Sequence, residues 1–118
     1  MLSKGKALEI LEKGLKYSEA DQTELLLLEE DFNLTRFAEN IIHQNIARRD
    51  HEVMARAVLG KKIGVAVTNK IEDEGIKKVV MDAIEIAKNQ KEDPDFLSLP
   101  QSEPGSEVKG FYKNTLNF

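Results

Sequence analysis

Residues 52–68, EVMARAVLGKKIGVAVT, decide the fold of this chain. Apolar residues occupy every second position before Gly60 and again after Lys62, which is the period of a β-strand. Gly60 supplies the unusual φ angle that a tight hairpin turn needs. Small residues at Gly64 and Ala66 predict the close approach of another element on their side of the strand. The segment therefore predicts an antiparallel hairpin.

Two further strands are predicted upstream of this hairpin. Residues 24–32 contain Leu25–Leu28, which is apolar on both parities and suits a strand covered on both faces. Leucine is not a strong strand former, so propensity alone leaves a helix open for this segment. The next predicted strand is residues 41–47. Together with the hairpin, these segments predict a meander of about four antiparallel strands.

One helix is predicted before the strands in the sequence and a second helix after them. Residues 2–17 repeat apolar side chains at helical spacing, namely Ala7, Leu8, Leu11 and Leu15. Residues 69–89 begin with Asn69 as a possible N-cap and Glu72 three residues later, the pattern of a capping box. The second helix has a longer apolar stripe, formed by Ile76, Val79, Val80, Ala83, Ile84 and Ala87. The predicted fold class is α+β, an antiparallel sheet packed with an amino-terminal helix and a second helix.

The composition changes after residue 90. All three prolines lie beyond this point, among polar residues and glycines. We therefore predict one α/β domain over residues 1–90 and an extended arm or linker over residues 91–118. Phe111-Tyr112 and Leu116–Phe118 are more apolar than a free tail needs. They are predicted either to dock on the sheet or to begin a further unit.

Composition excludes several classes of function. The net charge is −4, from 17 basic and 21 acidic residues, and each basic pair has acidic neighbours, which argues against direct nucleic-acid binding. The longest apolar run, Leu25–Leu28, is far too short for a membrane helix. The chain has no cysteine, so thiolate nucleophiles and thiolate metal sites are excluded. We expect a cytoplasmic protein.

No stretch of this sequence forms a complete catalytic or metal motif. His51-Glu52 begins like a zinc-protease helix, but Ala55 stands where the second histidine is required. The alternating pattern also places His51 and Glu52 on opposite faces of a strand. Gly60-Lys61-Lys62 lacks the spacing of a phosphate loop, and residues 29–31, EED, look like a strand end in solvent. We predict no catalytic residue, no metal ligand and no cofactor in this chain.

Two motifs carry a family resemblance. Residues 34–45, LTRFAENIIHQN, resemble the L-T-R-F-A-N-x-x-I-H-Q-N segment of the TldD/PmbA family. Residues 61–69, KKIGVAVTN, resemble a second segment of that family, and so do the following helix and residues 95–100, DFLSLP. The resemblance covers most of the chain up to about Pro100. The family is described both as metallopeptidases and, by an older label, as modulators of DNA gyrase.

The resemblance implies a non-catalytic amino-terminal domain of a longer protein. TldD-type members carry an H-E-x-x-x-H metal motif in their carboxy-terminal part, which this sequence does not contain. Zinc is therefore expected only in such a carboxy-terminal domain, of a TldD-type member or partner, and the chain alone is expected to be inactive. The implied role is in metal-dependent proteolysis or peptide maturation, within a homo- or heterodimer and on a peptide or protein substrate. The alternatives are a regulator that acts on gyrase by protein contact, without peptidase activity, and an unrelated α/β interaction module.

The candidate site lies in the first motif. Its polar residues are predicted to line a substrate cleft or to contact a partner subunit; they are Arg36, Asn40, His43, Gln44 and Asn45. A strand edge at this place suits main-chain pairing with an extended peptide. In the competing interpretation, Asn40 serves a turn and the other four are ordinary surface groups.

Overall fold

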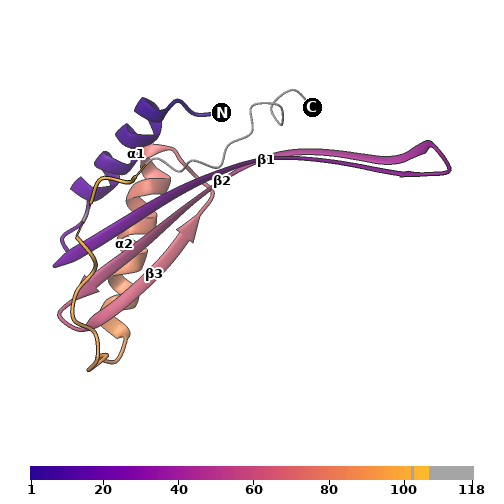
Figure 1. Cartoon of the computed structure of the whole chain (residues 1–118). Helices are drawn as coiled ribbons and strands as arrows, with labels where there is room; N and C mark the ends of the chain where they lie inside the picture. Colours follow the sequence, from indigo (N-terminus) through magenta and orange to yellow (C-terminus); the bar gives the residue numbers. More distant parts are fainter. Residues whose placement is uncertain (102, 107–118) are drawn as a thin grey trace.

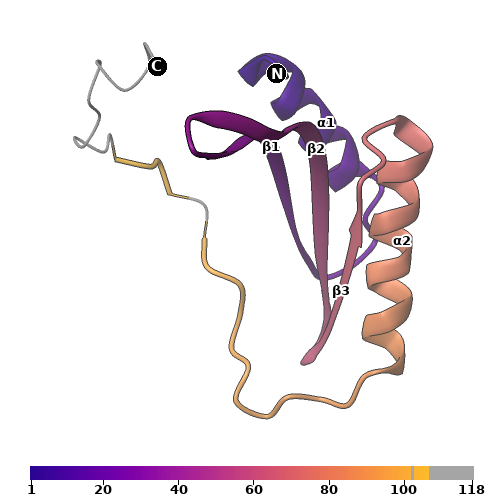
Figure 2. The ribbon, with the colours of Figure 1, turned by 90° about the vertical axis from the view of Figure 1, so that its right-hand side faces the viewer.

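The computed structural model describes residues 1–101 and 103–106 and shows a two-layer α+β fold (Figure 1). In chain order the elements are α1 (Lys4–Lys16), β1 (Gln22–Ala38), β2 (Ile41–Leu59), β3 (Lys62–Thr68) and α2 (Asp73–Asn89). The strands form an antiparallel meander in the order β1-β2-β3, and both helices cover the same face of it (Figure 2). The predicted fold class is confirmed.

The predicted number of strands is wrong, because the described residues form three strands rather than about four. The segments 41–47 and 52–59 belong to one strand, β2, which is 19 residues long. The charged residues 48–51 between them look like a loop in the sequence. In the structure Arg48 Nη2 donates to Glu30 Oε2 at 2.6 Å, so the charges pair with β1 and the strand continues.

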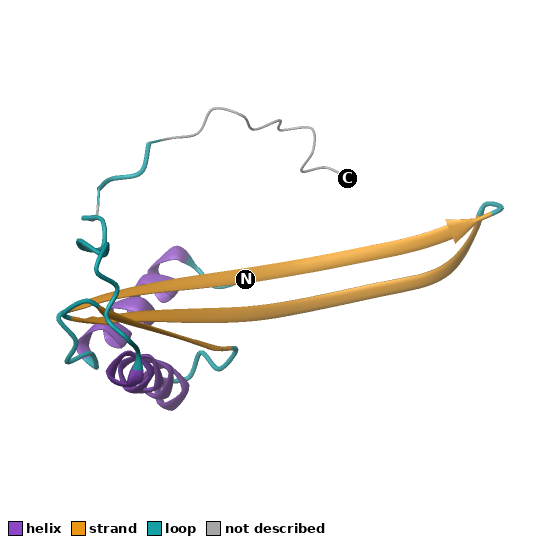
Figure 3. Cartoon of the chain, turned by 90° about the horizontal axis from the view of Figure 1, so that it is seen from below, coloured by secondary structure: helices purple, strands orange, loops and turns teal. Residues whose placement is uncertain are grey.

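The two long strands extend well beyond the rest of the sheet. β3 pairs with β2 only between Val53 and Leu59, whereas β1 pairs with β2 along its whole length. Residues 30–50, here called the hairpin arm, project away from the helices as a two-stranded ribbon (Figures 1 and 3). Every residue of the hairpin arm is exposed except the half-buried Leu34.

The core lies between α2 and the sheet. Every residue of the predicted α2 stripe is buried, and β2 contributes Val53, Ala55 and Ala57, each 0% exposed. Gly64 of β3 faces α2 so closely that an added Cβ would lie 2.1 Å from the carbonyl oxygen of Ala83. The close approach predicted from the small residues of β3 is confirmed. The turn at Gly60, whose φ is +61°, is also confirmed.

The ends and faces of the helices differ from the sequence prediction in two respects. α1 buries Ile10 and Gly14, whereas Leu8 and Leu15 of the predicted stripe are 47% and 45% exposed. The N-cap of α2 is Glu72, without a side-chain cap hydrogen bond, so the predicted capping box at Asn69 is wrong. The spacing of the leucines alone did not show which side of α1 faces the core.

After α2 the chain crosses to the face of the sheet opposite the helices (Figure 2). Asp93 N–H donates to the carbonyl of Lys61 at 2.9 Å, and Leu99 N–H donates to Gln22 Oε1 at 3.0 Å. This path agrees with the extended segment predicted after residue 90, and the boundary between residues 90 and 91 stays a prediction. The apolar residues at 111–118 lie outside the described residues.

Candidate functional site

The tip of the hairpin arm is a two-residue turn. Glu39 and Asn40 have φ angles of +52° and +61°, between the paired residues Ala38 and Ile41. Positive φ at both central positions is what a type I′ hairpin turn requires, and asparagine tolerates it better than most residues. The backbone geometry gives Asn40 a turn role, as the competing interpretation expected.

A β-bulge follows the turn on β2. Arg36 pairs with Gln44 and Phe37 pairs with Ile42, so His43 has no partner on β1. An extra residue bends its strand and increases the local twist, which reorients the side chains near it. The motif residue His43 therefore lies at an irregularity of the arm and is exposed.

The candidate residues lie on both faces of the arm. Arg36 and Gln44 are directly opposite each other, so they share a face. Asn45 is opposite Thr35 on the other face, where the Thr35 hydroxyl donates to Asn45 Oδ1 at 2.9 Å. The structure thus brings the five candidate residues to one end of the arm but does not gather them into a single cluster.

The tip also carries apolar side chains that the sequence reasoning did not include. Phe37, Ile41 and Ile42 are 72%, 61% and 68% exposed. Exposed large apolar side chains that lie together, unlike single ones, mark interaction surfaces. The signal in the sequence was an aromatic and two isoleucines directly beside a turn, where no neighbouring strand covers them.

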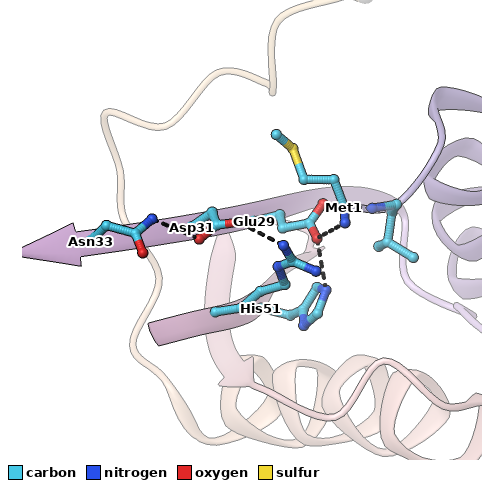
Figure 4. Close-up of polar contacts among 7 residues, drawn as sticks. Met1, Glu29, Asp31, Asn33 and His51 are labelled. Atoms are coloured by element: carbon cyan, nitrogen blue, oxygen red, sulfur yellow. Dashed lines mark hydrogen bonds and ion pairs between the residues drawn. The ribbon is translucent and has the colours of Figure 1, made fainter. Parts of the chain in front are cut away.

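A polar network holds the base of the arm (Figure 4). Leu2 N–H donates to Glu29 Oε2 at 2.8 Å, and His51 Nε2 lies 3.2 Å from Glu29 Oε1. The terminal ammonium of Met1 is 3.7 Å from the same oxygen. The prediction that residues 29–31 are a strand end in solvent is wrong, because they lie inside β1 and have partners across the hairpin and in the N-terminal segment.

These contacts stabilise the ionised carboxylates. The backbone N–H of Leu2 is the main cause that lowers the pKa of Glu29 below its ordinary value. The hydrogen bond from Arg49, with an Nη2 to Oδ2 distance of 2.6 Å, lowers the pKa of Asp31 in the same way. Both carboxylates are held in the charged form, as in a structural network rather than an acid–base pair.

The residues at the arm base do not fit a zinc site. Glu29 and His51 form one pair, and Glu29 Oε2 already accepts a hydrogen bond from the backbone. Structural and catalytic zinc sites take at least three protein ligands. Within residues 1–101 and 103–106, no group of three His, Cys, Asp or Glu side chains is placed to hold a metal ion. Neither described helix has the length and apolar character needed to cross a membrane.

The described residues form an α+β body from which a long, exposed β-ribbon projects. This architecture is the class to which the fold assigns the chain, and its distinctive surface is the hairpin arm. Residues 23–87, more than half of the chain, match the family model described as PmbA/TldA metallopeptidase domain 1. The chain belongs to this family, as the two sequence motifs predicted.

A solved structure gives the same fold. The crystal structure of TldE from Thermococcus kodakarensis matches with a TM-score of 0.69 and 24% sequence identity, over 93% of this chain. At that identity the likeness concerns the fold alone. The present chain spans only 24% of the length of that TldE chain. A search of curated proteins gave no match.

Proposed function

We propose that this chain serves as the non-catalytic first domain of a TldD/PmbA-like protein that acts in metal-dependent proteolysis or peptide maturation. In this role the hairpin arm helps to form the substrate cleft and the contact between subunits. The chemistry is supplied by another domain or chain, which holds the zinc. The substrate is an extended peptide, and the proposed location is the cytoplasm.

The free strand edge of β2 carries this proposal. β3 ends its pairing at Val53, so no described strand pairs with the outer edge of β2 over residues 41–52. An exposed edge of this length presents a row of unpaired N–H and C=O groups. A peptide that lies in line with β3 would extend the sheet by main-chain hydrogen bonds, which recognise backbone rather than sequence. This mode suits a protease that accepts varied substrates.

The polar and the apolar side chains at the tip have different proposed roles. The peptide contact is assigned to Arg36 and Gln44, which lie opposite each other across β1 and β2, with Gln44 on the strand that has the free edge. The exposed Phe37 and Ile42 also form a direct cross-strand pair, on the other face of the arm. An apolar pair at the end of an arm suits contact with a second subunit, because burial of such side chains stabilises association.

Fluorescence anisotropy with a labelled unstructured peptide tests the edge. The full chain is expected to bind the peptide, and the same peptide N-methylated at alternate residues is expected to bind at least tenfold more weakly. Arg36→Ala and Gln44→Ala should weaken binding, whereas Lys78→Ala, on the exposed side of α2, should not. Equal binding of the methylated peptide would refute pairing at the strand edge.

Metal analysis tests independently whether the zinc and the peptidase activity belong to another domain or chain. The chain alone is expected to hold no stoichiometric zinc and to cleave no peptide. One tightly bound zinc per chain would contradict the proposal that the metal belongs to another domain or chain. The alternative role as a regulator of gyrase rests on no specific contact among the described residues; a stable complex of this chain with gyrase would favour it.

A further inference from the structure

The outer edge of β2 presents the backbone N–H groups of alternate residues only. In an antiparallel sheet, successive residues of a central strand direct their N–H and C=O groups to opposite neighbours. Leu59 and Lys62 flank the two-residue turn between β2 and β3, and the pair that flanks such a turn is hydrogen-bonded. The odd-numbered residues in this part of β2 therefore face β3. In agreement, the carbonyl of Val58, an even-numbered residue, accepts from Asp21 N–H at 3.0 Å on the side of β1.

The first of these N–H groups beyond the end of β3 is closed by a neighbouring side chain. β3 pairs with β2 no further than Val53, and the pairing of β2 with β1 is regular there, so His51 is the next residue whose N–H points to the free edge. This N–H donates to Asp50 Oδ1 at 2.9 Å. A strand added in line with β3 needs the same N–H for its first main-chain hydrogen bond. Charged side chains protect exposed sheet edges from pairing, and Asp50 closes the place at which a strand would join.

The face of the sheet on which Asp50 lies is open. Asp50 has the opposite parity in β2 to Val53, which is buried in the core beside α2, so Asp50 is on the face opposite the helices. Leu26 and Leu28 of β1, on the same face, are 43% and 52% exposed. The sequence predicted that the Leu25–Leu28 stretch is covered on both faces. Among the described residues, only the helix face is covered, so a side chain of an added strand has access to Asp50.

The charge of Asp50 has no cationic partner among the described residues. Arg48, the neighbouring basic residue of β2 on the same face, pairs with Glu30 at 2.6 Å. No ion pair within residues 1–101 and 103–106 includes Asp50, whose side chain is exposed. A residue of an added strand directly opposite Asp50 projects on the same face, with the two Cβ atoms about 5 Å apart. A lysine or arginine there can reach the carboxylate, whereas a neutral residue leaves it on the His51 N–H.

We propose that Asp50 is a specificity-determining residue of the β2 edge, which closes the His51 N–H to neutral strands and releases it to a peptide with lysine or arginine opposite Asp50. This inference rests on the proposed function, in which an extended peptide pairs with the same edge. The carboxylate exchanges a backbone N–H for an ammonium or guanidinium group, with which it forms a charge-assisted hydrogen bond. The freed His51 N–H then donates to a carbonyl of the peptide.

Amide hydrogen exchange in the full chain tests the closing contact without any peptide. In Asp50→Ala, the His51 N–H is expected to exchange at least fivefold faster than in the parent, because its acceptor is removed. Glu52→Ala is the matched control: it removes the carboxylate on the other side of His51 in the sequence, whereas the N–H donates to Asp50. Equal exchange rates in the two variants would overturn the closing role of Asp50.

Fluorescence anisotropy with two labelled unstructured peptides tests the selectivity. The peptides differ only at every second residue, which is lysine in one and glutamine in the other. The parent chain is expected to bind the lysine peptide at least fivefold more tightly than the glutamine peptide. Asp50→Ala should bind the glutamine peptide at least threefold more tightly than the parent does, because the edge is open. Asp50→Asn keeps an oxygen acceptor for the His51 N–H, so it should bind the glutamine peptide as the parent does and lose most of the preference for lysine.

The outcomes separate this inference from the proposed function. A lysine preference that is unchanged in Asp50→Asn would overturn the selective role of Asp50, although the peptides still bind at the edge. Binding of the glutamine peptide that is unchanged or weaker in Asp50→Ala would overturn its closing role. If neither peptide binds to the parent or to any variant, the pairing of peptides with the edge is refuted, and the selective role with it. The exchange rate of the His51 N–H decides the closing role in every case.

Discussion

The contact between Gly64 and α2 gives a sharp test of the fold. In Gly64→Ala, the new Cβ would lie 2.1 Å from the carbonyl oxygen of Ala83 and 2.4 Å from the amide nitrogen of Ala87. Ordinary contact begins at about 3.4 Å, so α2 must withdraw from the sheet by more than about 1 Å. Both obstacles are backbone atoms of a helix, and no side-chain rotation relieves them.

The expected cost is at the upper end of the range for overpacked cores. Such substitutions destabilise by about 1–3 kcal/mol, and contact with backbone favours the larger value. A loss of about 3 kcal/mol corresponds to a decrease in Tm of roughly 12–24 °C for a domain of this size. With an m-value of about 2 kcal/mol/M, the urea midpoint would fall by ~1.5 M.

Unfolding followed by far-ultraviolet circular dichroism measures the effect, because the chain has no tryptophan. Gly5→Ala is the matched control: its Cβ meets nothing within 4 Å, and it lies in α1. Alanine is preferred over glycine in a helix, so the control should be as stable as the parent or slightly more stable. A Gly64→Ala protein within about 0.5 kcal/mol of the parent would refute the close packing of α2 on β3.

Three further predictions concern the arm base, the turn and the core. The pKa of Glu29 is depressed below its ordinary value of 4.5, so the stabilising effect of this carboxylate is complete above pH 4.5 and is lost as the pH falls through the folded-state pKa. Glu29→Gln should therefore flatten the acid limb of a plot of Tm against pH. An unchanged limb would contradict the role assigned to Glu29. Glu39→Asn combined with Asn40→Gly creates the preferred type I′ pair and should raise amide-exchange protection in the arm, whereas lower protection would contradict the turn geometry. Ile76→Ala removes a side chain that is 2% exposed and should cost ~2–5 kcal/mol in urea unfolding; the exposed Met81→Ala should cost less than about 1 kcal/mol, and equal costs would be inconsistent with the core.

Local periodicity was sufficient to predict the body of the fold. Apolar residues repeat with the period of a strand in the β2–β3 hairpin and with the period of a helix in α2. These residues meet in one core, so the sequence prediction and the structure agree there. Gly64 shows why the agreement reaches atomic detail, since only a residue without Cβ permits the observed approach of α2. The face of α1 was harder to predict because Ile10 and the leucine stripe lie next to each other around the helix.

The arm was missed because its stabilising contacts are not local in sequence. Residues 48–51 appear polar and irregular until they are placed opposite residues 29–32, across the turn at Glu39-Asn40. Their pairing follows from the register of the hairpin, and a run of charges in the sequence does not reveal that register. The candidate site was located by its motif rather than by its geometry. The division of its residues between two faces required the register and the bulge at His43.

Stability must decrease from the base of the arm to its tip, and this gradient bears on function. The base has the Glu29 network and the ion pairs of Arg48 and Arg49, and Arg48 also lies 5.3 Å from the centre of the Phe32 ring. Each exposed contact of this kind stabilises the ribbon only weakly. Beyond them, a two-stranded ribbon is only marginally stable in water. The tip residues therefore have the fewest stabilising contacts among the described residues. Under the proposed function, an added strand or a second subunit would supply them at the part of the chain where the family motif concentrates its polar side chains.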